Sequence, residues 1–481
     1  MVSEFRTSQV IVSLLLPWFG VMPCYSKSAT QATAPVLMVS DIHFEPFWDP
    51  GKAAQLAAAP EAEWTEILAS AASPDRETQF AAIQQACRTR GADTSYPLFA
   101  SSLVAMKANA GGAKFVTVSG DLISHSFNCK FAQVFPKARP GEYRVFVEKT
   151  IKFVILALHD ALPGVRVYAS LGNNDSDCSD NQLDANSSFL GDLDKVFTAD
   201  VPAIDLDEAR ADFAIGGNFS TALPRPFANT RLIVLDDLFM ASNYRTCAGE
   251  NDPAEATRQI EWLRTGLDGA RQAKQRVWVM AHIPPGVDPH STIAGGKSIC
   301  AGKDPTMFLS SDDLANALAP YGDVIALAIF AHTHMDEMRL ITSIDTPNPD
   351  HAVPVKFVSS ISPINGNNPS ITVAEVDPRT GTMVDYRVIA ASNQTGVDAQ
   401  WKQEYDYGQT YGEPAFSDSA LATLLGGLSA DTGAKSPESK AYLRNYFVGD
   451  RSIELAPFWP MATCALTNMS ADSFRACACS R

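Results

Sequence analysis

The sequence has 481 residues, of which 46% are hydrophobic and 19% are charged. This balance is that of a globular protein with a large core, and it excludes a chain that is disordered throughout. The formal net charge is −16, so we expect no nucleic-acid partner, because nucleic acid is itself anionic.

Residues 1–32 are predicted to be a signal peptide. The apolar run from Ile11 to Met22 is shorter than the roughly 20 residues that a membrane span needs. Small residues that suit cleavage follow it at Ser26, Ala29 and Ala32. No later stretch is long and apolar enough to be a transmembrane segment. We therefore expect a secreted or periplasmic protein.

Cysteine content supports the same location. One of the nine cysteines, Cys24, lies in the predicted signal peptide, and eight remain. An even set is typical of disulfides in an oxidising compartment, and the alternative is a set of buried free thiols. Their pairing cannot be read from the sequence.

Apolar runs in chain order predict an α/β protein. Central strands are expected at residues 35–40, 114–121, 165–171, 230–238, 276–281 and 324–330, and helices at 143–161 and 253–274. An alanine-rich helical insertion is predicted at residues 53–110, between the first two strands. Turn-separated strands at 355–360, 371–376 and 383–389 predict antiparallel strands that close a second sheet.

The end of the chain has a different character. Residues after about 395 are polar and then helical, near 417–425 and 436–447, with cysteines at 464, 477 and 479. We predict a main domain over residues 33–395 and a helical, disulfide-bearing subdomain over 396–481.

Polar residues follow several of the apolar runs, and these are the candidate site residues. They are Asp41-Ile42-His43, Gly120-Asp121, Gly172-Asn173, His282 and His332-Thr333-His334. Open α/β sheets place their sites at the carboxyl ends of strands. With His125, these segments use five of the eight histidines.

Carboxylates and imidazoles in this number indicate a site for two metal ions. Two divalent ions about 4 Å apart can clamp the attacking and leaving oxygens of a displacement at phosphorus. Such a site needs one carboxylate that reaches both ions, and Asp121 is the candidate.

This set of motifs, in this order, resembles the calcineurin-like metallophosphoesterases over about residues 36–389. The resemblance implies a four-layer α/β/β/α sandwich. It implies that Asp41, His43, Asp121 and His334 bind one metal, and that Asp121, Asn173, His282 and His332 bind the other. A hydroxide that bridges the metals would be the nucleophile.

The helical insertion, the Ala281-His282-Ile283-Pro284-Pro285-Gly286 segment and the cysteine-bearing tail resemble the acid sphingomyelinase-like branch. In that branch a histidine four residues after the bridging aspartate lies near the leaving group, and His125 matches it. A purple acid phosphatase would have tyrosine where this chain has Ser124. Two positions depart from the family pattern: Ala331 replaces a glycine, and Asn174 replaces a histidine that helps to protonate the leaving group. His125 is therefore the candidate acid, and the alternative is that it orients a metal ligand.

Several other polar and aromatic residues near these segments are not expected to bind metal or substrate. Asp175 and Asp336 are expected to cap or hydrogen-bond rather than to bind metal. Phe44, Phe47 and Trp48 could form a platform for lipid or base, but a role in covering the edge of the core is favoured. Zn²⁺ is the expected metal, with Mn²⁺ or Fe as alternatives.

The expected function is hydrolysis of phosphate esters, with phosphodiesters favoured. The expected substrate is a small phosphate ester or a phospholipid headgroup. One alternative is a phosphomonoesterase or a nucleotide or polyphosphate hydrolase on the same site. The non-enzyme alternative is a degenerate metal-binding relative.

Overall fold

The computed structural model describes residues 1–2, 32–227, 229–296, 298–342, 351–449 and 455–480. The chain from Thr33 to Arg481 forms one compact unit. The predicted signal peptide, including Cys24, lies outside the described residues except for residues 1, 2 and 32. Within the described ranges, no helix is long and apolar enough to cross a membrane.

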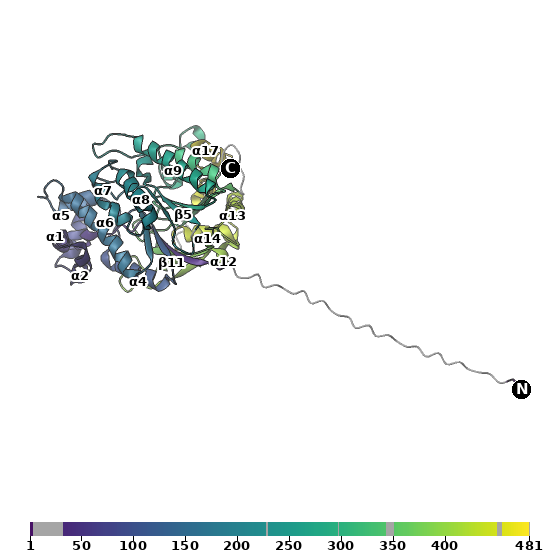
Figure 1. Ribbon diagram of the computed structural model, residues 1–481, viewed down its shortest axis with the longest axis horizontal. Coiled ribbons are helices and arrows are strands. Elements are labelled where there is room, and N and C mark those ends of the chain that lie inside the picture. The colour runs from purple at the N-terminus through teal and green to yellow at the C-terminus, as the bar shows by residue number, and fades with distance from the viewer. Residues whose placement is uncertain (3–31, 228, 297, 343–350, 450–454, 481) are drawn as a thin grey trace. The chain divides into compact units, whose positions relative to one another are not determined.

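Two six-stranded mixed sheets form the centre of this unit (Figure 1). The first has the strand order β12 (Trp401–Asp406), β11 (Met383–Ala391), β10 (Ser370–Val376), β1 (Ala34–Val39), β2 (Phe115–Ser119) and β3 (Arg166–Ser170). The second has the order β4 (Phe219–Ala222), β5 (Thr230–Val234), β6 (Arg276–Met280), β7 (Ile325–Phe330), β9 (Val353–Phe357) and β8 (Glu337–Ile341).

Parallel strands lie in the middle of both sheets. In the first sheet β1, β2 and β3 are parallel, and in the second β5, β6, β7 and β9 are parallel. Nearly every residue of these strands is buried, as expected for parallel strands that are covered on both faces. The predicted central strands are therefore confirmed.

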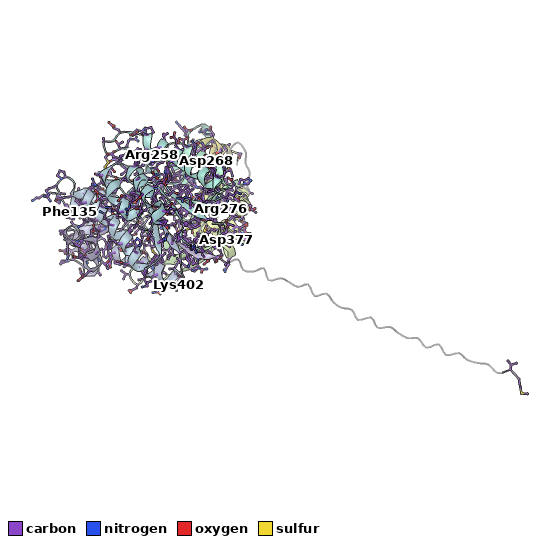
Figure 2. All side chains as sticks on the ribbon, in the orientation of Figure 1. Phe135, Arg258, Asp268, Arg276, Asp377 and Lys402 are labelled. Atoms are coloured by element: carbon purple, nitrogen blue, oxygen red, sulfur yellow. A yellow bond between two sulfur atoms is a disulfide. The ribbon has the colours of Figure 1, made fainter. Side chains whose placement is uncertain are left out.

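Facing aromatic side chains show how the two sheets pack. The Phe115 ring on β2 lies 5.6 Å from the Trp278 ring on β6, edge to face. Trp278 Nε1 donates to Gly381 O at 2.7 Å. Arg276 Nε donates to Thr380 O at 3.2 Å. Thr380 lies in the turn that follows β10 and begins at Asp377. Figure 2 labels both Arg276 and Asp377. The turn after β10 is thus tied to the second sheet.

Helices cover the outer faces. In the insertion these are α1 (Ala53–Ala58), α2 (Trp64–Ala69), α3 (Arg76–Cys87) and α4 (Tyr96–Asn109). The core helices are α5 (Phe127–Val134), α6 (Glu142–Ala161), α7 (Ser188–Phe197), α8 (Ala203–Gly216), α9 (Ala254–Gln272), α10 (Pro289–Ala294) and α11 (Asp313–Leu318). Because α4 and α6 pack on the first sheet and α9 on the second, the layers are α/β/β/α as predicted.

The C-terminal part contains α12 (Tyr407–Tyr411), α13 (Asp418–Ala430), α14 (Pro437–Tyr446), α16 (Trp459–Cys464) and α17 (Ala471–Ala478). The helices predicted near 417–425 and 436–447 are confirmed by α13 and α14. The boundary near residue 395 stays a prediction.

The prediction that the last three strands close a second sheet was wrong in its topology. Strands β10 and β11 extend the first sheet beside β1, and β12, which was not predicted, continues it. Only β9 joins the second sheet, between β7 and β8. A run of strand-like residues does not reveal which sheet edge it pairs with, and here β10 returns to the first strand of the chain.

All eight cysteines of the predicted set form disulfides. The pairs are Cys87–Cys129, Cys178–Cys247, Cys300–Cys479 and Cys464–Cys477. The alternative of free thiols is thereby excluded for these eight.

Candidate metal centre

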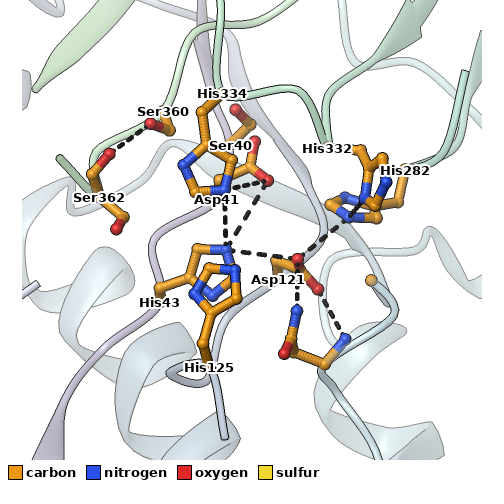
Figure 3. A network of polar contacts seen from close by, with 12 residues as sticks. Ser40, Asp41, His43, Asp121, His125, His282, His332, His334, Ser360 and Ser362 are labelled. Carbon is orange, nitrogen blue, oxygen red and sulfur yellow. Dashed lines mark hydrogen bonds and ion pairs between the residues drawn. The ribbon is translucent and has the colours of Figure 1, made fainter. Parts of the chain in front are cut away.

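The predicted ligands follow the ends of five parallel strands. Asp41, Asp121, His282 and His332 each come two residues after the last residue of their strand, and Asn173 comes three residues after β3. Because the central strands within each sheet are in register, their ends bring these side chains to one edge. Figure 3 shows the resulting cluster, with the predicted histidines pointing toward Asp41 and Asp121.

Asp121 lies at the middle of this cluster. Its Oδ2 is 3.3 Å from His43 Nε2 and 3.1 Å from His282 Nε2. It belongs both to the group formed with Asp41 and His43 and to the group formed with His282 and His332, each of which could hold a metal ion. These groups indicate two metal-ion positions that share one carboxylate.

On one side of Asp121, His43 and His334 approach each other, with 3.2 Å between their Nε2 atoms. His334 Nε2 also lies 3.5 Å from Asp41 Oδ1. Neither oxygen of Asp41 accepts a hydrogen bond from the residues that the structure describes. Burial raises the pKa of the Asp41 carboxyl to about 7. A bound cation would supply the partner that these oxygens lack.

On the other side, Asn173 Oδ1 lies 2.8 Å from His332 Nδ1 and 3.1 Å from His282 Nε2. The two imidazoles are themselves close, at 3.3 Å between His332 Nδ1 and His282 Nε2. The structure therefore brings together all seven predicted ligands.

Backbone carbonyls orient two of the imidazoles. His43 Nδ1 lies 2.9 Å from Ile123 O, and His282 Nδ1 lies 2.8 Å from Ser119 O. A carbonyl can only accept, so each Nδ1 carries a proton, and in the neutral ring Nε2 is the atom that presents a lone pair to the cluster. Such lone pairs, facing one another beside two carboxylates, fit divalent cations, and the outer hydrogen bonds fix the ligand orientation.

The turns that carry these residues are tight. Five of the predicted ligands have positive φ angles: Asp41 (42°), His43 (43°), Asp121 (55°), His332 (67°) and His334 (69°). Left-handed backbone is uncommon for residues other than glycine, and it is concentrated at functional sites. A Cβ atom at Gly172 would lie 2.2 Å from Asp121 Oδ1, so a glycine is required there.

Asp175 and Asn174 hold Asp121 and its turn in place. Asp175 accepts hydrogen bonds from the backbone N–H groups of Leu122, Ile123 and Gly172. It thus holds the turn around Asp121. Asn174 donates from its backbone N to Asp121 Oδ1 and from its Nδ2 to Oδ2, both at 2.9 Å. Asp336 pairs instead with Lys356 and accepts from Tyr405 OH at 2.8 Å.

His125 lies next to the first group. Its ring stacks on His43, with 3.9 Å between the ring centroids, and it could join His43 and His334 around a metal ion. Its Nδ1 lies 3.0 Å from Asp93 Oδ1. Burial by itself would lower the pKa of His125, but the charge and hydrogen bond of Asp93 outweigh it and raise the pKa.

Asp93 is the residue that the sequence analysis missed. It lies in the helical insertion, two residues before Ser95, which caps α4, and so its sequence context is that of a helix start.

A cavity of about 500 Å³ opens beside the cluster, and Asp121, His125, Asn173, His332 and His334 all line it. Its wall also includes Arg90, Asp180, Phe308 and Tyr446. The loop that carries Phe44, Phe47 and Trp48 does not line this cavity. Phe44 and Phe47 are buried in the core against Phe99 and Phe127, which confirms the favoured expectation for these two residues.

An aspartate shared by two groups of ligand side chains, at the edge of two facing mixed sheets, is the arrangement that the resemblance to the calcineurin-like metallophosphoesterases implies. No protein-family model matches the chain. Human acid sphingomyelinase-like phosphodiesterase 3b is 25% identical over 406 residues, which cover 80% of each protein. Human cyclic GMP-AMP phosphodiesterase SMPDL3A is 27% identical over 396 residues, again 80% of each. The similarity to these relatives supports the expected resemblance to the acid sphingomyelinase-like branch.

Two further proteins are similar to this chain. Sphingomyelinase phosphodiesterase D of Dictyostelium discoideum is 25% identical over 396 residues and 80% of each chain. Among solved structures, a dimetal phosphatase from Danio rerio has a TM-score of 0.39 and 11% identity, over 77% of this chain and 98% of that one.

Proposed function

We propose that the protein is a metal-dependent phosphodiesterase that uses two divalent cations. The observation that carries this proposal is the position of Asp121 between two groups of ligand side chains. Asp41, His43, Asp121 and His334 would hold one cation, and Asp121, Asn173, His282 and His332 the other. Zn²⁺ is the preferred metal, and this mixture of nitrogen and oxygen ligands also suits Mn²⁺ or Fe.

Two bound cations would polarise the phosphoryl group and stabilise the charge that develops during displacement. The protein's own residues would position this chemistry. Asn174 holds both oxygens of Asp121, and the carbonyls of Ile123 and Ser119 fix the imidazoles of His43 and His282. His125 would protonate the leaving oxygen from Nε2, because its Nδ1 is engaged by Asp93.

An Asp121→Asn variant tests the site. An amide cannot offer an anionic oxygen to each of two cations, so we expect turnover of bis(4-nitrophenyl) phosphate to fall below detection. Asp207→Asn is the matched control, because Asp207 is exposed on α8. Elemental analysis should give two metal equivalents in the wild type and in the control, and fewer in Asp121→Asn. Normal turnover by Asp121→Asn would refute the proposal.

Two kinds of substrate are suggested by the relatives. One human relative is named as a cyclic GMP-AMP phosphodiesterase and one Dictyostelium relative as a sphingomyelinase phosphodiesterase. We favour a phosphodiester of either kind over a monoester. Parallel rate measurements on bis(4-nitrophenyl) phosphate, 4-nitrophenyl phosphate, ATP and sphingomyelin separate these options. Faster turnover of 4-nitrophenyl phosphate than of bis(4-nitrophenyl) phosphate would show that the protein is a phosphomonoesterase instead.

We also propose that the protein works outside the cytosol, as a secreted or periplasmic enzyme. The four disulfides support this location, because such bonds persist in oxidising compartments. Cell fractionation with thiol counting tests it, and a reduced, cytosolic pool of active enzyme would contradict it.

A further inference from the structure

Asp93 accepts two hydrogen bonds from His125. Its Oδ1 accepts from the ring atom Nδ1 at 3.0 Å, and its Oδ2 accepts from the His125 backbone N at 2.9 Å. We propose that Asp93 is the positioning residue for His125, which fixes the imidazole so that Nε2–H faces the leaving oxygen of a bound phosphodiester. This inference rests on the proposed function, since it assigns a role within the same reaction.

The Asp93 carboxylate is itself held by a buried network. Ser362 Oγ donates to Oδ1 at 3.0 Å, and Lys130 Nζ lies 3.4 Å from Oδ2. Lys130 also pairs with Glu45, and Lys130, Glu45 and Asp93 are all buried. Burial alone would raise the pKa of Asp93, but the charges of His125 and Lys130 outweigh burial and hold it well below the usual value. Asp93 therefore stays ionised and can only accept hydrogen bonds.

Backbone hydrogen bonds place this network rigidly beside the metal centre. Thr94 N donates to His43 O at 3.2 Å, and Glu45 N donates to Thr94 O at 2.9 Å. Phe44 N donates in turn to Leu122 O at 2.8 Å. The segments that carry Asp93, His43 and His125 are thus fastened side by side. The helical insertion thereby contributes a polar group to the site as well as a side wall.

The geometry leaves His125 little freedom. One edge of its ring is held by Asp93, and one face stacks on His43 with 22° between the ring planes. His125 is also the residue best suited to supply a proton. Asn174, which stands where the family commonly has histidine, is an amide and is engaged by Asp121.

In the proposed step, the oxygen of a hydroxide ion derived from water forms a bond to phosphorus while the bond from phosphorus to the leaving oxygen breaks. The electron pair of that bond stays on the leaving oxygen, which takes the proton from His125 Nε2. His125 is left neutral, with its Nδ1 proton still directed at Asp93, and is reprotonated from solvent.

An Asp93→Asn variant of the full chain tests this role on two substrates. An amide keeps the size of the carboxylate but has one acceptor oxygen, so its NH₂ group would face one of the two N–H groups of His125 and that hydrogen bond would be lost. We expect kcat to fall about 100-fold for a diester with an alkyl leaving group, the lower end of the usual range for general acids. For bis(4-nitrophenyl) phosphate, whose leaving group needs no proton, we expect a loss of less than about 10-fold. KM should change little.

A double variant separates positioning from a general structural effect. If Asp93 acts through His125, then Asp93→Asn combined with His125→Ala should be no slower than His125→Ala alone, because residues in contact are not additive. All three variants should keep two metal equivalents. Asp75→Asn is the matched control, because Asp75 is an exposed carboxylate at the start of α3 in the same insertion.

Equal losses on the two substrates, additive losses in the double variant, or loss of metal from Asp93→Asn or His125→Ala would each overturn the inference. Should Asp93→Asn fail to fold, Ser362→Ala removes one of the donors to Asp93 and should give a smaller loss with the same dependence on the leaving group. Absence of phosphodiester turnover by the wild type would refute the proposed function instead, so the two failures are distinguishable.

Discussion

At the scale of single residues, the site depends on groups that hold the ligands rather than on the ligands alone. His43 and His282 each donate a hydrogen bond from Nδ1 to a backbone carbonyl, and Asp121 accepts two hydrogen bonds from Asn174. These contacts determine which atom of each side chain would face the proposed cations. They also show why a motif of ligand residues does not by itself make a metal centre.

Asn174→Ala should weaken metal binding. The variant removes the bond from Nδ2 to Asp121 Oδ2, and loss of such a supporting contact typically costs about 10- to 100-fold in metal affinity or activity. Activity at limiting metal should therefore need a correspondingly higher metal concentration for half-saturation. Asn243→Ala is the control, because Asn243 is exposed on the wall of the same cavity. An unchanged metal dependence in Asn174→Ala would show that Asn174 has no supporting role.

Asp93 could not be identified as a site residue from the sequence. The ligands could be found because each follows a buried apolar strand and matches a known order of motifs. Asp93 follows no strand and precedes a helix cap, so nothing in its neighbourhood marks it as part of a site. Only the fold brings it against His125. The positive φ angles of the ligand turns were likewise invisible in the sequence, since aspartate and histidine do not require them.

At the scale of elements, the loop after β3 connects the candidate metal centre to a disulfide. Asn173 Nδ2 donates to Asp180 Oδ1 at 2.6 Å, and Asn181 N donates to Asn173 O at 2.9 Å. The same loop carries Cys178, which is bonded to Cys247 in the facing loop. Arg245 N donates to Asn181 O across the same contact. The loop that presents Asn173 is thus fixed at both ends.

Replacing Cys178 and Cys247 together by serine should lower activity more than it lowers the content of folded protein. Loss of a native disulfide typically costs about 2–5 kcal/mol of stability, and here it also frees the loop that carries Asn173. The control is the Cys464→Ser, Cys477→Ser pair, whose disulfide joins α16 to α17. Both pairs should melt at lower temperature, as measured by circular dichroism. Equal specific activities of the two variants below their melting temperatures would contradict the expectation.

The strands that could be predicted from the sequence are those whose buried residues are apolar. The strands β1, β2, β6 and β7 are apolar runs and were found. Strand β8 was missed because Glu337 and Arg339 are buried within it and pair with each other. Strand β12 is an edge strand rich in charged residues, and charged edge strands lack the hydrophobic signal of central ones. Disulfide pairing could not be predicted, because it depends on loops that only the fold brings together.

At the scale of the whole molecule, the candidate metal ligands come from both sheets. The first sheet supplies Asp41, His43, Asp121 and Asn173 from the ends of β1, β2 and β3, and the second supplies His282, His332 and His334 from β6 and β7. Cations held by both sets would connect the sheets at this edge. They would also offset the buried carboxylates of Asp41 and Asp121, which otherwise face each other's charge in a low-dielectric interior.

Removal of metal should therefore lower stability as well as activity. A ligand that binds the folded state alone stabilises it by about 2.7 kcal/mol when its free concentration is 100 times its Kd, so chelation should reduce the melting temperature by several degrees. Restoring Zn²⁺ should recover both the melting temperature and turnover of bis(4-nitrophenyl) phosphate. Asp121→Asn provides the comparison, because a chain that has lost the shared carboxylate should respond much less to the chelator. If the chelator abolishes turnover but leaves the wild-type melting temperature unchanged, the cations do not hold the two sheets together, and the ligand set must be sought within one sheet.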